Sequence, residues 1–225
     1  MIKEKLQRGT ILYKIYLYYN IFIRYRFLKR NKKSFSQFGE DLFIAEFFAN
    51  QKEGKYVDLG AFHPMRLSNT YLLFKKGWSG TNIDLNPMSI NLFNMTRKRD
   101  KNIIACLSNK RKISQIYFDD NFSPLNSIYN NNKKNFALKN IKKIKVRTKV
   151  FSDLVKDKFD FLNIDCEDSD FDILKTINLN HYKPKLICIE IRPNNKFNIY
   201  KYLRLSGYRL FKIKKVSHFF IRNKY

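Results

Sequence analysis

The sequence predicts an α/β fold in which a mostly parallel sheet of seven strands carries helices on both faces, ends in an antiparallel hairpin and is preceded by a helical extension. The 225 residues are 44% hydrophobic, which is enough apolar material for one core and hardly for two. From Ser34 onward, short β-branched runs alternate with helical periods, as in sheets covered on both faces. Residues 1–33 instead carry ten Lys or Arg against a single acid, Glu4. We therefore predict an N-terminal extension, 1–33, and one domain, 34–225.

The extension contains a run of Tyr, Ile, Leu and Phe between residues 11 and 23, which predicts a helix. This run is shorter than the roughly 20 apolar residues that cross a bilayer, and Lys14 and Asn20 interrupt it. Its basic flanks fit docking on an anionic membrane surface or in a groove of a partner protein. Packing on its own domain, or a poorly ordered arm, fits equally well.

The first half of the domain is predicted to alternate helices and strands. Ser36 is expected to cap the first helix, Gly77 to close the second and Pro87 to open the third. The predicted elements are helix 37–50, strand 56–59, a helix through 71–74, strand 81–84, a helix from 87, and strands 102–107 and 113–118. An Asn-rich loop, 119–135, follows them.

The second half of the domain continues the same alternation. Gly207 is expected to stop the last helix before the terminal hairpin. The predicted elements are an edge or connecting strand 145–150, a buried central strand 159–164, helix 169–177, strand 186–191, helix 198–205, and hairpin strands 208–213 and 218–221.

The three cysteines, Cys106, Cys166 and Cys188, are far apart in the sequence and lie in or beside predicted strands. An odd number of separated cysteines favours buried reduced thiols over a disulfide framework or a zinc site. Together with the lack of a secretory signal, this pattern predicts a reducing compartment, the cytoplasm.

The turn after the first strand favours S-adenosylmethionine (SAM) over a dinucleotide. A dinucleotide turn needs three glycines so that the backbone can approach a pyrophosphate, whereas here Gly60 stands alone before Ala61. Asp58 would repel phosphates and attract the cationic amino group and sulfonium of SAM. Asp84 ends the second strand, where an acid hydrogen-bonds both ribose hydroxyls. The predicted cofactor residues here are Asp58, Gly60, Ala61, Asp84, Leu85 and Ser108.

Two further acids, Asp165 and Glu167, follow the central strand. Ligands bind at the carboxyl ends of the strands in open α/β sheets, and the same edge would hold Asp58 and Asp84. We therefore add Asp165 to the predicted cofactor site. The alternative is a helix N-terminus rich in acids, which complements the helix dipole.

Several sequence blocks, in this order, resemble the FkbM family of SAM-dependent methyltransferases. They are SQFGED (36–41), YVDLGAFHP (56–64), RLSNT (66–70), GWSG (77–80), NIDLNP (82–87), RD (99–100), FLNIDCE (161–167) and KLICIEI (185–191). The resemblance implies a Rossmann-like methyltransferase fold and O-methylation of sugars or other hydroxylated acceptors. One departure is that Asp168 stands where the family commonly has Gly, after the acid that corresponds to Glu167.

Methylation of a hydroxyl requires alignment with the methyl group and a group that takes the proton. His63 is the first candidate base because it follows the predicted SAM turn, although before Pro64 it could instead cap the next helix. His181, in a predicted loop, and His218, in the hairpin, belong to no motif. Asp165 and Glu167 are the other catalytic candidates. Aided by Asp84 or His63, these two acids could instead hold Mg²⁺ that lowers the pKa of the hydroxyl.

Substrate contacts are expected from polar side chains on loops above the sheet. The candidates are Arg66, Ser68 and Asn69 after the first strand, and Asn126 in the loop around 123–127. Ordinary loop and cap chemistry is the competing interpretation.

The formal charge of +26 allows anionic partners, but charge spread over every segment is more typical of a solvated surface. The expected acceptor is a glycan or a small hydroxylated molecule. Two rival functions stay open: a nucleic-acid methyltransferase, for which the 14 Tyr and 21 Phe could provide stacking platforms, and a non-catalytic SAM-binding scaffold at a membrane complex.

Overall fold

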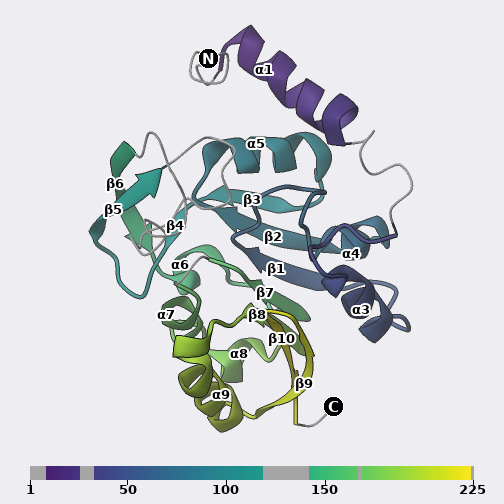
Figure 1. Ribbon diagram of the computed structural model, residues 1–225, viewed down its shortest axis with the longest axis vertical. Helices are drawn as coiled ribbons and strands as arrows, with labels where there is room; N and C mark the ends of the chain where they lie inside the picture. The colour runs from purple at the N-terminus through teal and green to yellow at the C-terminus, as the bar shows by residue number, and fades with distance from the viewer. Residues whose placement is uncertain (1–8, 26–32, 119–141, 167–168, 224–225) are drawn as a thin grey trace.

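The computed structural model describes residues 9–25, 33–118, 142–166 and 169–223, and they form two sheets with helices around them (Figure 1). The larger sheet has seven strands in the order β3-β2-β1-β7-β8-β10-β9. Its strands are β3 Lys101–Ile104, β2 Ser79–Asp84, β1 Lys55–Leu59, β7 Phe161–Ile164, β8 Leu186–Glu190, β10 Ser217–Arg222 and β9 Tyr208–Lys214. The predicted seven-stranded fold is confirmed.

The strand directions also agree with the prediction. β1 pairs in parallel with β2 on one side and with β7 on the other, while β3 and β8 extend the parallel set outward. β9 and β10 form the antiparallel hairpin that closes the sheet. The carboxyl ends of five neighbouring strands therefore lie along one edge, which we call the carboxyl edge, and their amino ends lie along the opposite, amino edge.

Side chains alternate along the strands and build two cores, one on each face of the sheet. Val57, Leu162 and Ile187 are cross-strand neighbours on one face, where they pack under four helices. These helices are α6 Phe151–Leu154, α7 Asp170–Leu174, α8 Leu179–Tyr182 and α9 Lys196–Leu205, which a 3-10 turn, Pro193–Asn195, precedes. Tyr56 and Phe161 face the other side.

The second face of the sheet lies against α3 Glu40–Phe47 and α4 Tyr71–Lys75, with α5 Pro87–Thr96 next to β2 and β3 (Figure 1). Ile44 and Leu73 from these helices pack with Trp78 on Tyr56 and Phe161. Both faces of the sheet are therefore covered, as the fold class requires.

The smaller sheet, β4-β6-β5, corrects two predictions. The single strand predicted over 102–107 is divided into β3 and β4 Cys106–Leu107, because β3 pairs with β2 as far as Ile104 whereas β4 pairs with β6 in the other sheet. The predicted edge strand 145–150 is β6 Lys142–Lys149, which lies between β4 and β5 Ile113–Phe118.

Three further local predictions differ from the structure. Helix α3 begins at Glu40 rather than at residue 37, because Asp41 accepts hydrogen bonds from the hydroxyls of Ser34 (2.6 Å) and Ser36 (2.7 Å) and so holds the preceding residues in a loop. His181 lies inside α8 rather than in a loop. Helix α7 is shorter than the predicted 169–177.

The N-terminal extension contains the predicted helix, α1 Ile11–Tyr18, which Thr10 caps and which continues as a π-helical segment, Tyr19–Tyr25. Tyr13, Leu17 and Ile21 pack against α5, so one face of the helix lies on its own domain. Within the described ranges, no helix is long and apolar enough to cross a membrane. The boundary at residues 33 and 34 stays a prediction.

The three cysteines are free thiols and lie where the strands were expected. Cys106 is in β4 and Cys188 in β8, both buried, while Cys166 follows β7 and is half-buried. Burial raises the pKa of the Cys106 thiol to about 11, so it remains protonated at neutral pH.

Candidate active site

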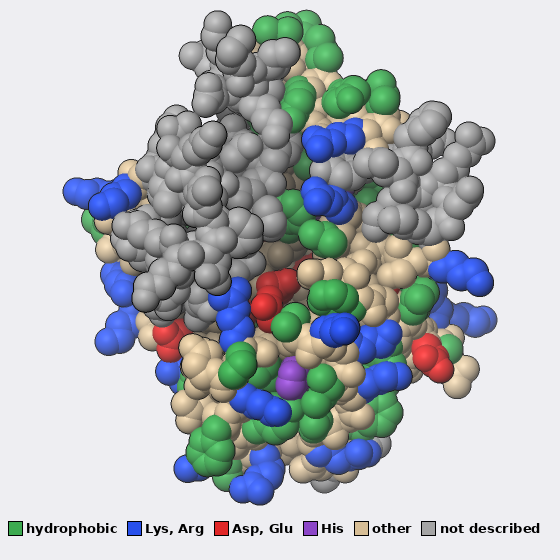
Figure 2. Space-filling view, in the orientation of Figure 1, with side chains coloured by type: hydrophobic (Ala, Val, Ile, Leu, Met, Phe, Trp, Pro, Cys, Tyr) green, Lys and Arg blue, Asp and Glu red, His purple; other side chains and the backbone are tan. Residues whose placement is uncertain are grey.

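The carboxyl edge brings Asp58, Asp84 and Asp165 together from separate segments. Asp84 is the last residue of β2, Asp58 the last but one of β1, and Asp165 follows β7 directly. Because β1 lies between β2 and β7, the three acids occupy neighbouring positions on one edge. Figure 2 shows acidic side chains in a hollow near the middle of the face drawn there, close to Lys and Arg side chains.

Gly60 makes a very close approach to the neighbouring strand end. Its φ of +76° lies in the left-handed region, and a Cβ at this position would lie 1.7 Å from the carbonyl oxygen of Asp165. Its N–H donates to the Ile83 carbonyl (2.9 Å), so the turn is tied to both adjacent strands. A side chain is therefore excluded here for a structural reason, independent of any ligand.

Asp84 ties the ends of two strands together. Its Oδ2 accepts from the Phe62 N–H (2.9 Å) and its Oδ1 from the Asn86 N–H (2.6 Å). Burial raises the pKa of this carboxyl to about 6, against the effect of both hydrogen bonds. Each oxygen keeps a further lone pair, so the carboxylate can still accept hydrogen bonds from the two hydroxyls of a ribose.

Asp58 is buried, at 2% exposure, and polar side chains contact both of its oxygens. Oδ2 accepts from the Thr70 hydroxyl (2.7 Å) and Oδ1 from the Asn163 amide (2.8 Å). Burial raises the pKa of Asp58, and the hydrogen bond from Thr70 acts in the opposite direction. The observed contacts make Asp58 an anchor for the segment that follows β1, while its predicted contact with SAM stays a prediction.

A row of polar residues crosses the sheet at the level of Asp58. The strand registers align Asn102, Asn82, Asp58, Asn163 and Cys188 on five adjacent strands. Asn163 also accepts from the Asn69 amide (2.9 Å). The row lies one or two residues before the strands end at the carboxyl edge, and it fixes the loops above it, because each hydrogen bond joins two different segments.

Arg97, which the sequence did not single out, is fully buried and connects this row to α5 and to the segment after β1. Its guanidinium donates to the hydroxyls of Thr70 (2.8 Å) and Ser68 (2.8 Å) and to the Pro64 carbonyl (3.0 Å). It also lies 3.9 Å from the Asp100 carboxylate. The sequence offered one indication of this role, a basic residue three positions before Asp100. In a chain with 45 Lys and Arg, that spacing does not distinguish Arg97 from other basic residues.

The predicted substrate contacts divide into three groups. Ser68 is buried, and its hydroxyl accepts from Arg97, while Asn69 is half-buried and donates to Asn163. Arg66 is exposed, with its guanidinium 6.0 Å from the centre of the Phe62 ring. Asn126 lies outside the described residues. Among the three candidates that the structure describes, Arg66 is the exposed one, so its side chain is the most accessible to an acceptor.

His63 caps the turn that follows it. Its Nδ1 accepts from the backbone N–H groups of Met65 (3.0 Å) and Arg66 (2.9 Å), and the ring is 3% exposed. The lone pair of a neutral imidazole is the one that a general base uses, and here two backbone donors occupy it. The contacts therefore fit the cap interpretation, and the catalytic role stays a prediction.

Asp165 is exposed at the carboxyl edge, beside the Gly60 turn. Glu167, its predicted partner, lies outside the described residues. Nowhere in the described ranges do three His, Cys, Asp or Glu side chains come close enough together to hold a metal ion. The Mg²⁺ alternative therefore has no support from these contacts.

The remaining predicted cofactor residues lie around the same edge. Ala61 is buried, and its N–H donates to the Ile83 carbonyl (3.3 Å). Leu85 follows β2 and is half-buried, like Ser108, which follows β4 and donates to the Lys149 carbonyl (3.0 Å). All three positions are compatible with a ligand lying across the ends of β1 and β2.

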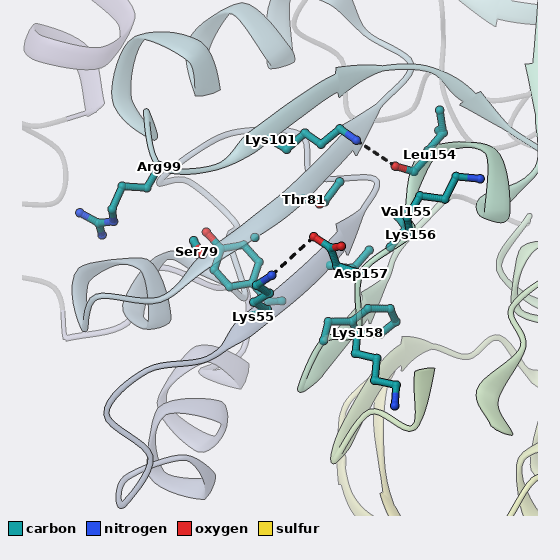
Figure 3. Close-up of a pocket in the computed structure, with 14 residues that line it drawn as sticks. Lys55, Ser79, Thr81, Arg99, Lys101, Leu154, Val155, Lys156, Asp157 and Lys158 are labelled. Carbon is teal, nitrogen blue, oxygen red and sulfur yellow. Dashed lines mark hydrogen bonds and ion pairs between the residues drawn. The ribbon is translucent and has the colours of Figure 1, made fainter. Parts of the chain in front are cut away.

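A basic cleft of about 280 Å³ lies at the other end of the strands, where β1, β2 and β3 begin (Figure 3). Its lining contains five cations and one acid, Lys55, Arg99, Lys101, Lys156, Lys158 and Asp157. Figure 3 shows the Lys55 ammonium directed toward Asp157, 3.5 Å away. Because this cleft is at the amino edge, it is separate from the acids described above.

Comparison with solved structures shows that the sheet and its helices form a Rossmann-like, SAM-dependent methyltransferase fold. A TehB-like SAM-dependent methyltransferase from Corynebacterium glutamicum superposes with a TM-score of 0.50 and 13% identity, over 88% of this chain and 94% of that one. An FkbM methyltransferase from Methylobacillus flagellatus superposes with a TM-score of 0.52 and 12% identity, over 76% of this chain. The chain spans only 44% of the length of that second protein.

The sequence identifies the family. Residues 58–210, more than half of the chain, match the methyltransferase FkbM domain. The chain therefore belongs to the FkbM methyltransferase family, as the motif blocks predicted, and this membership supports SAM-dependent methylation. No curated protein sequence matches it.

Proposed function

We propose that this chain is a SAM-dependent O-methyltransferase that methylates a hydroxyl of a sugar, a glycan or another hydroxylated acceptor. The observation that carries the proposal is the meeting of Asp58, Asp84 and Asp165 at the carboxyl edge of a methyltransferase fold. A chain with a formal charge of +26 has few acids, and gathering them at one edge favours a cationic ligand.

The residues at this edge fit SAM, which supplies an electrophilic methyl group when bound. Asp84 is held by two backbone donors in an orientation that leaves lone pairs for the ribose hydroxyls. Gly60 has no side chain, so the turn after β1 can pack directly against the backbone of Asp165, the residue after β7. The network around Asp58 and Arg97 holds the loop above them in place.

Asp165 is the residue that we assign as proton acceptor. It is exposed at the edge, whereas the imidazole Nδ1 of His63 already accepts two backbone hydrogen bonds. In the proposed reaction the acceptor oxygen forms a bond to the methyl carbon, the bond from that carbon to sulfur breaks, and the hydroxyl proton passes to the Asp165 carboxylate.

The test is a radiolabelled methyl-transfer assay with SAM and a panel of hydroxylated acceptors, combined with calorimetric titration of SAM. We expect Asp165→Asn to lower turnover about 10²-fold or more, because a general base contributes that much, and to weaken SAM by a much smaller factor, since Asp58 and Asp84 keep their charges. The matched control is Asp157→Asn, an exposed acid at the amino edge. If Asp165→Asn retains full turnover on an acceptor that the wild-type protein methylates, Asp165 is not the base.

His63→Asn separates the cap from the base. The Asn carbonyl oxygen can replace Nδ1 as acceptor for the Met65 and Arg66 N–H groups, but an amide cannot take a proton. We expect this variant to keep its turnover. A loss as large as that of Asp165→Asn, in a variant with unchanged thermal stability, would return the catalytic role to His63.

A nucleic-acid methyltransferase is the second candidate, and the observation that bears on it is the basic cleft. Its five cations could bind phosphates, but they lie at the amino edge, away from the acids that would receive the methyl donor. Including RNA and DNA in the same acceptor panel tests this directly. Methyl transfer to nucleic acid, with none to hydroxylated glycans, would replace the first proposal.

A further inference from the structure

Helix α1 and the π-helical segment after it have apolar side chains on two sides. The inner side is accounted for, because Tyr13, Leu17 and Ile21 are 5%, 4% and 2% exposed and pack on Met88 and Leu92 of α5. The Tyr13 hydroxyl also accepts from the Asn91 amide (2.7 Å). These contacts fix the helix against the domain (Figure 1) and determine which side faces outward.

The outer side is also apolar, and it is exposed. Leu12, Ile15 and Tyr18 are 63%, 59% and 60% exposed. We call this surface the outer face of α1, and its members are Ile11, Leu12, Ile15, Tyr18, Tyr19, Phe22 and Ile23. Single apolar residues are common on protein surfaces. Seven large apolar side chains on one side of a helical segment instead form a patch, and such patches mark contact sites.

The charge around this face determines what it fits. Residues 9–25 contain no acid, and Lys14 is exposed within the helix. The whole stretch 1–33 carries ten cations and one acid, with three cations before the helix and five after Arg24. Apolar and aromatic side chains between basic flanks, on a helix that does not span a bilayer, are typical of interfacial helices.

We infer that the outer face of α1 docks on the surface of an anionic lipid bilayer, which attracts a segment with ten cations and one acid in its sequence. A second copy of the chain would be a poorer occupant, because a symmetric contact through this face would bring together two segments of ten cations each. An anionic bilayer covers the apolar side chains and neutralises the cations at the same time.

Docking in this way places the bilayer near the candidate active site. Met65, in the segment that follows β1, and Met88, at the start of α5, both pack with the inner side of α1. Both belong to segments that begin at the carboxyl edge. If the methyltransferase proposal holds, this arrangement favours an acceptor carried at the membrane surface over a freely diffusing one.

The test is vesicle co-sedimentation of the full chain with phosphatidylcholine alone and with phosphatidylcholine mixed with phosphatidylglycerol. We expect binding to the anionic vesicles only, and about tenfold or greater weakening in Leu12→Ser/Ile15→Ser, because two large apolar side chains no longer enter the interface. The matched control is Phe197→Ser/Leu205→Ser on α9, whose side chains are 76% and 75% exposed. We expect the control to bind like the wild-type protein.

Two outcomes would overturn the inference. If Leu12→Ser/Ile15→Ser binds anionic vesicles as well as the control does, the general positive charge and not the outer face attaches the protein. If the wild-type protein does not bind the vesicles and sediments as a dimer, while Leu12→Ser/Ile15→Ser sediments as a monomer, the outer face joins two copies of the chain. Calorimetric SAM affinity, measured in parallel, should be equal in all variants, so that failure of docking is distinguishable from failure of the SAM site.

Discussion

The two edges of the main sheet differ in charge although they belong to the same five parallel strands. At the amino edge, the acids pair with lysines: Asp157 lies 3.5 Å from Lys55, and Asp160 lies 3.0 Å from Lys185. At the carboxyl edge, Asp58 and Asp84 instead accept hydrogen bonds from hydroxyl, amide and backbone donors, which are neutral. Formal charge summed over the chain therefore gives no indication of where its chemistry lies.

The difference has an energetic meaning. A neutral hydrogen-bond donor stabilises a carboxylate without cancelling its charge, so the field of Asp84 still reaches a ligand. A lysine at ion-pair distance cancels most of that field. Asp84 therefore keeps its negative charge for a cation, and the following four experiments test this contrast in order of expected effect.

Arg97→Met should have the largest effect on stability. Arg97 is fully buried and holds Ser68 and Thr70, and its removal takes away the positive charge that lowers the pKa of both Asp58 and Asp100. We expect a loss of about 3–5 kcal/mol in the free energy of unfolding, measured in urea. Arg99→Met at the amino edge is the matched control, because Arg99 stacks on Phe74 at the surface and should cost less than about 1 kcal/mol. Equal losses would mean that the buried network contributes nothing specific.

Gly60→Ala should come next. Its Cβ would collide with the Asp165 carbonyl, so the carboxyl edge must open, and we expect a loss of at least about 3 kcal/mol together with SAM affinity. Gly207→Ala is the matched control: its φ of +82° is similar, but nothing lies within 4 Å of the added Cβ. This control should cost about 1–2 kcal/mol, the strain of the left-handed conformation alone. A similar cost in both variants would show that the turn relaxes around the added carbon.

Asp84→Asn should weaken SAM about 10- to 100-fold in calorimetric titrations, because an amide offers one acceptor oxygen where the carboxylate offers two. The pKa of about 6 gives two pH effects of opposite sign. SAM affinity of the wild-type protein should fall as the pH drops below about 6, since the carboxyl becomes protonated.

Stability should change the other way. Because the folded pKa of Asp84 lies above its ordinary value of 3.8, the folded state binds the proton more tightly, and the wild-type protein gains stability relative to Asp84→Asn as the pH falls from about 7 to about 4. Urea unfolding of both proteins across this range measures the difference. A difference that does not vary with pH would mean that Asp84 titrates normally.

The smallest effect is expected from Lys156→Ala/Lys158→Ala at the amino edge. These lysines line the basic cleft, far along the strands from the carboxyl edge, so SAM affinity should change by less than about twofold at moderate salt. Retention on an immobilised polyanion should decrease, measured as the salt concentration at elution. A large loss of SAM affinity would contradict the conclusion that the two edges act independently.

The sequence was sufficient for the fold and for the placement of the acids. Short apolar runs such as 56–59 and 161–164, each followed by a helical segment, predicted parallel strands, and an acid at the end of such a run must lie at the carboxyl edge. For this reason Asp84 and Asp165 were found without a structure.

The contacts of these residues were not predictable in the same way. Thr70 and Asn163 both donate hydrogen bonds to Asp58, from 12 and 105 residues away in the sequence. No local sequence pattern predicts either bond. Ser68 was expected at the substrate because it lies in a polar loop, yet Arg97, 29 positions later, takes its hydroxyl into the core. The division of 102–107 into two strands likewise depends on a distant partner, because Cys106 and Leu107 pair with Thr148 and Lys149 of β6.

In the small sheet, β5 and β6 come directly before and after residues 119–141 in the sequence. β5 pairs antiparallel with β6 over its whole length, with Phe118 opposite Lys142, so the residues on either side of the stretch 119–141 are held side by side. The cost of closing a longer or shorter insertion between clamped ends rises only slowly with its length. A change in the length of this stretch should therefore cost little, and it should leave the strand pairing of the seven-stranded sheet unaltered.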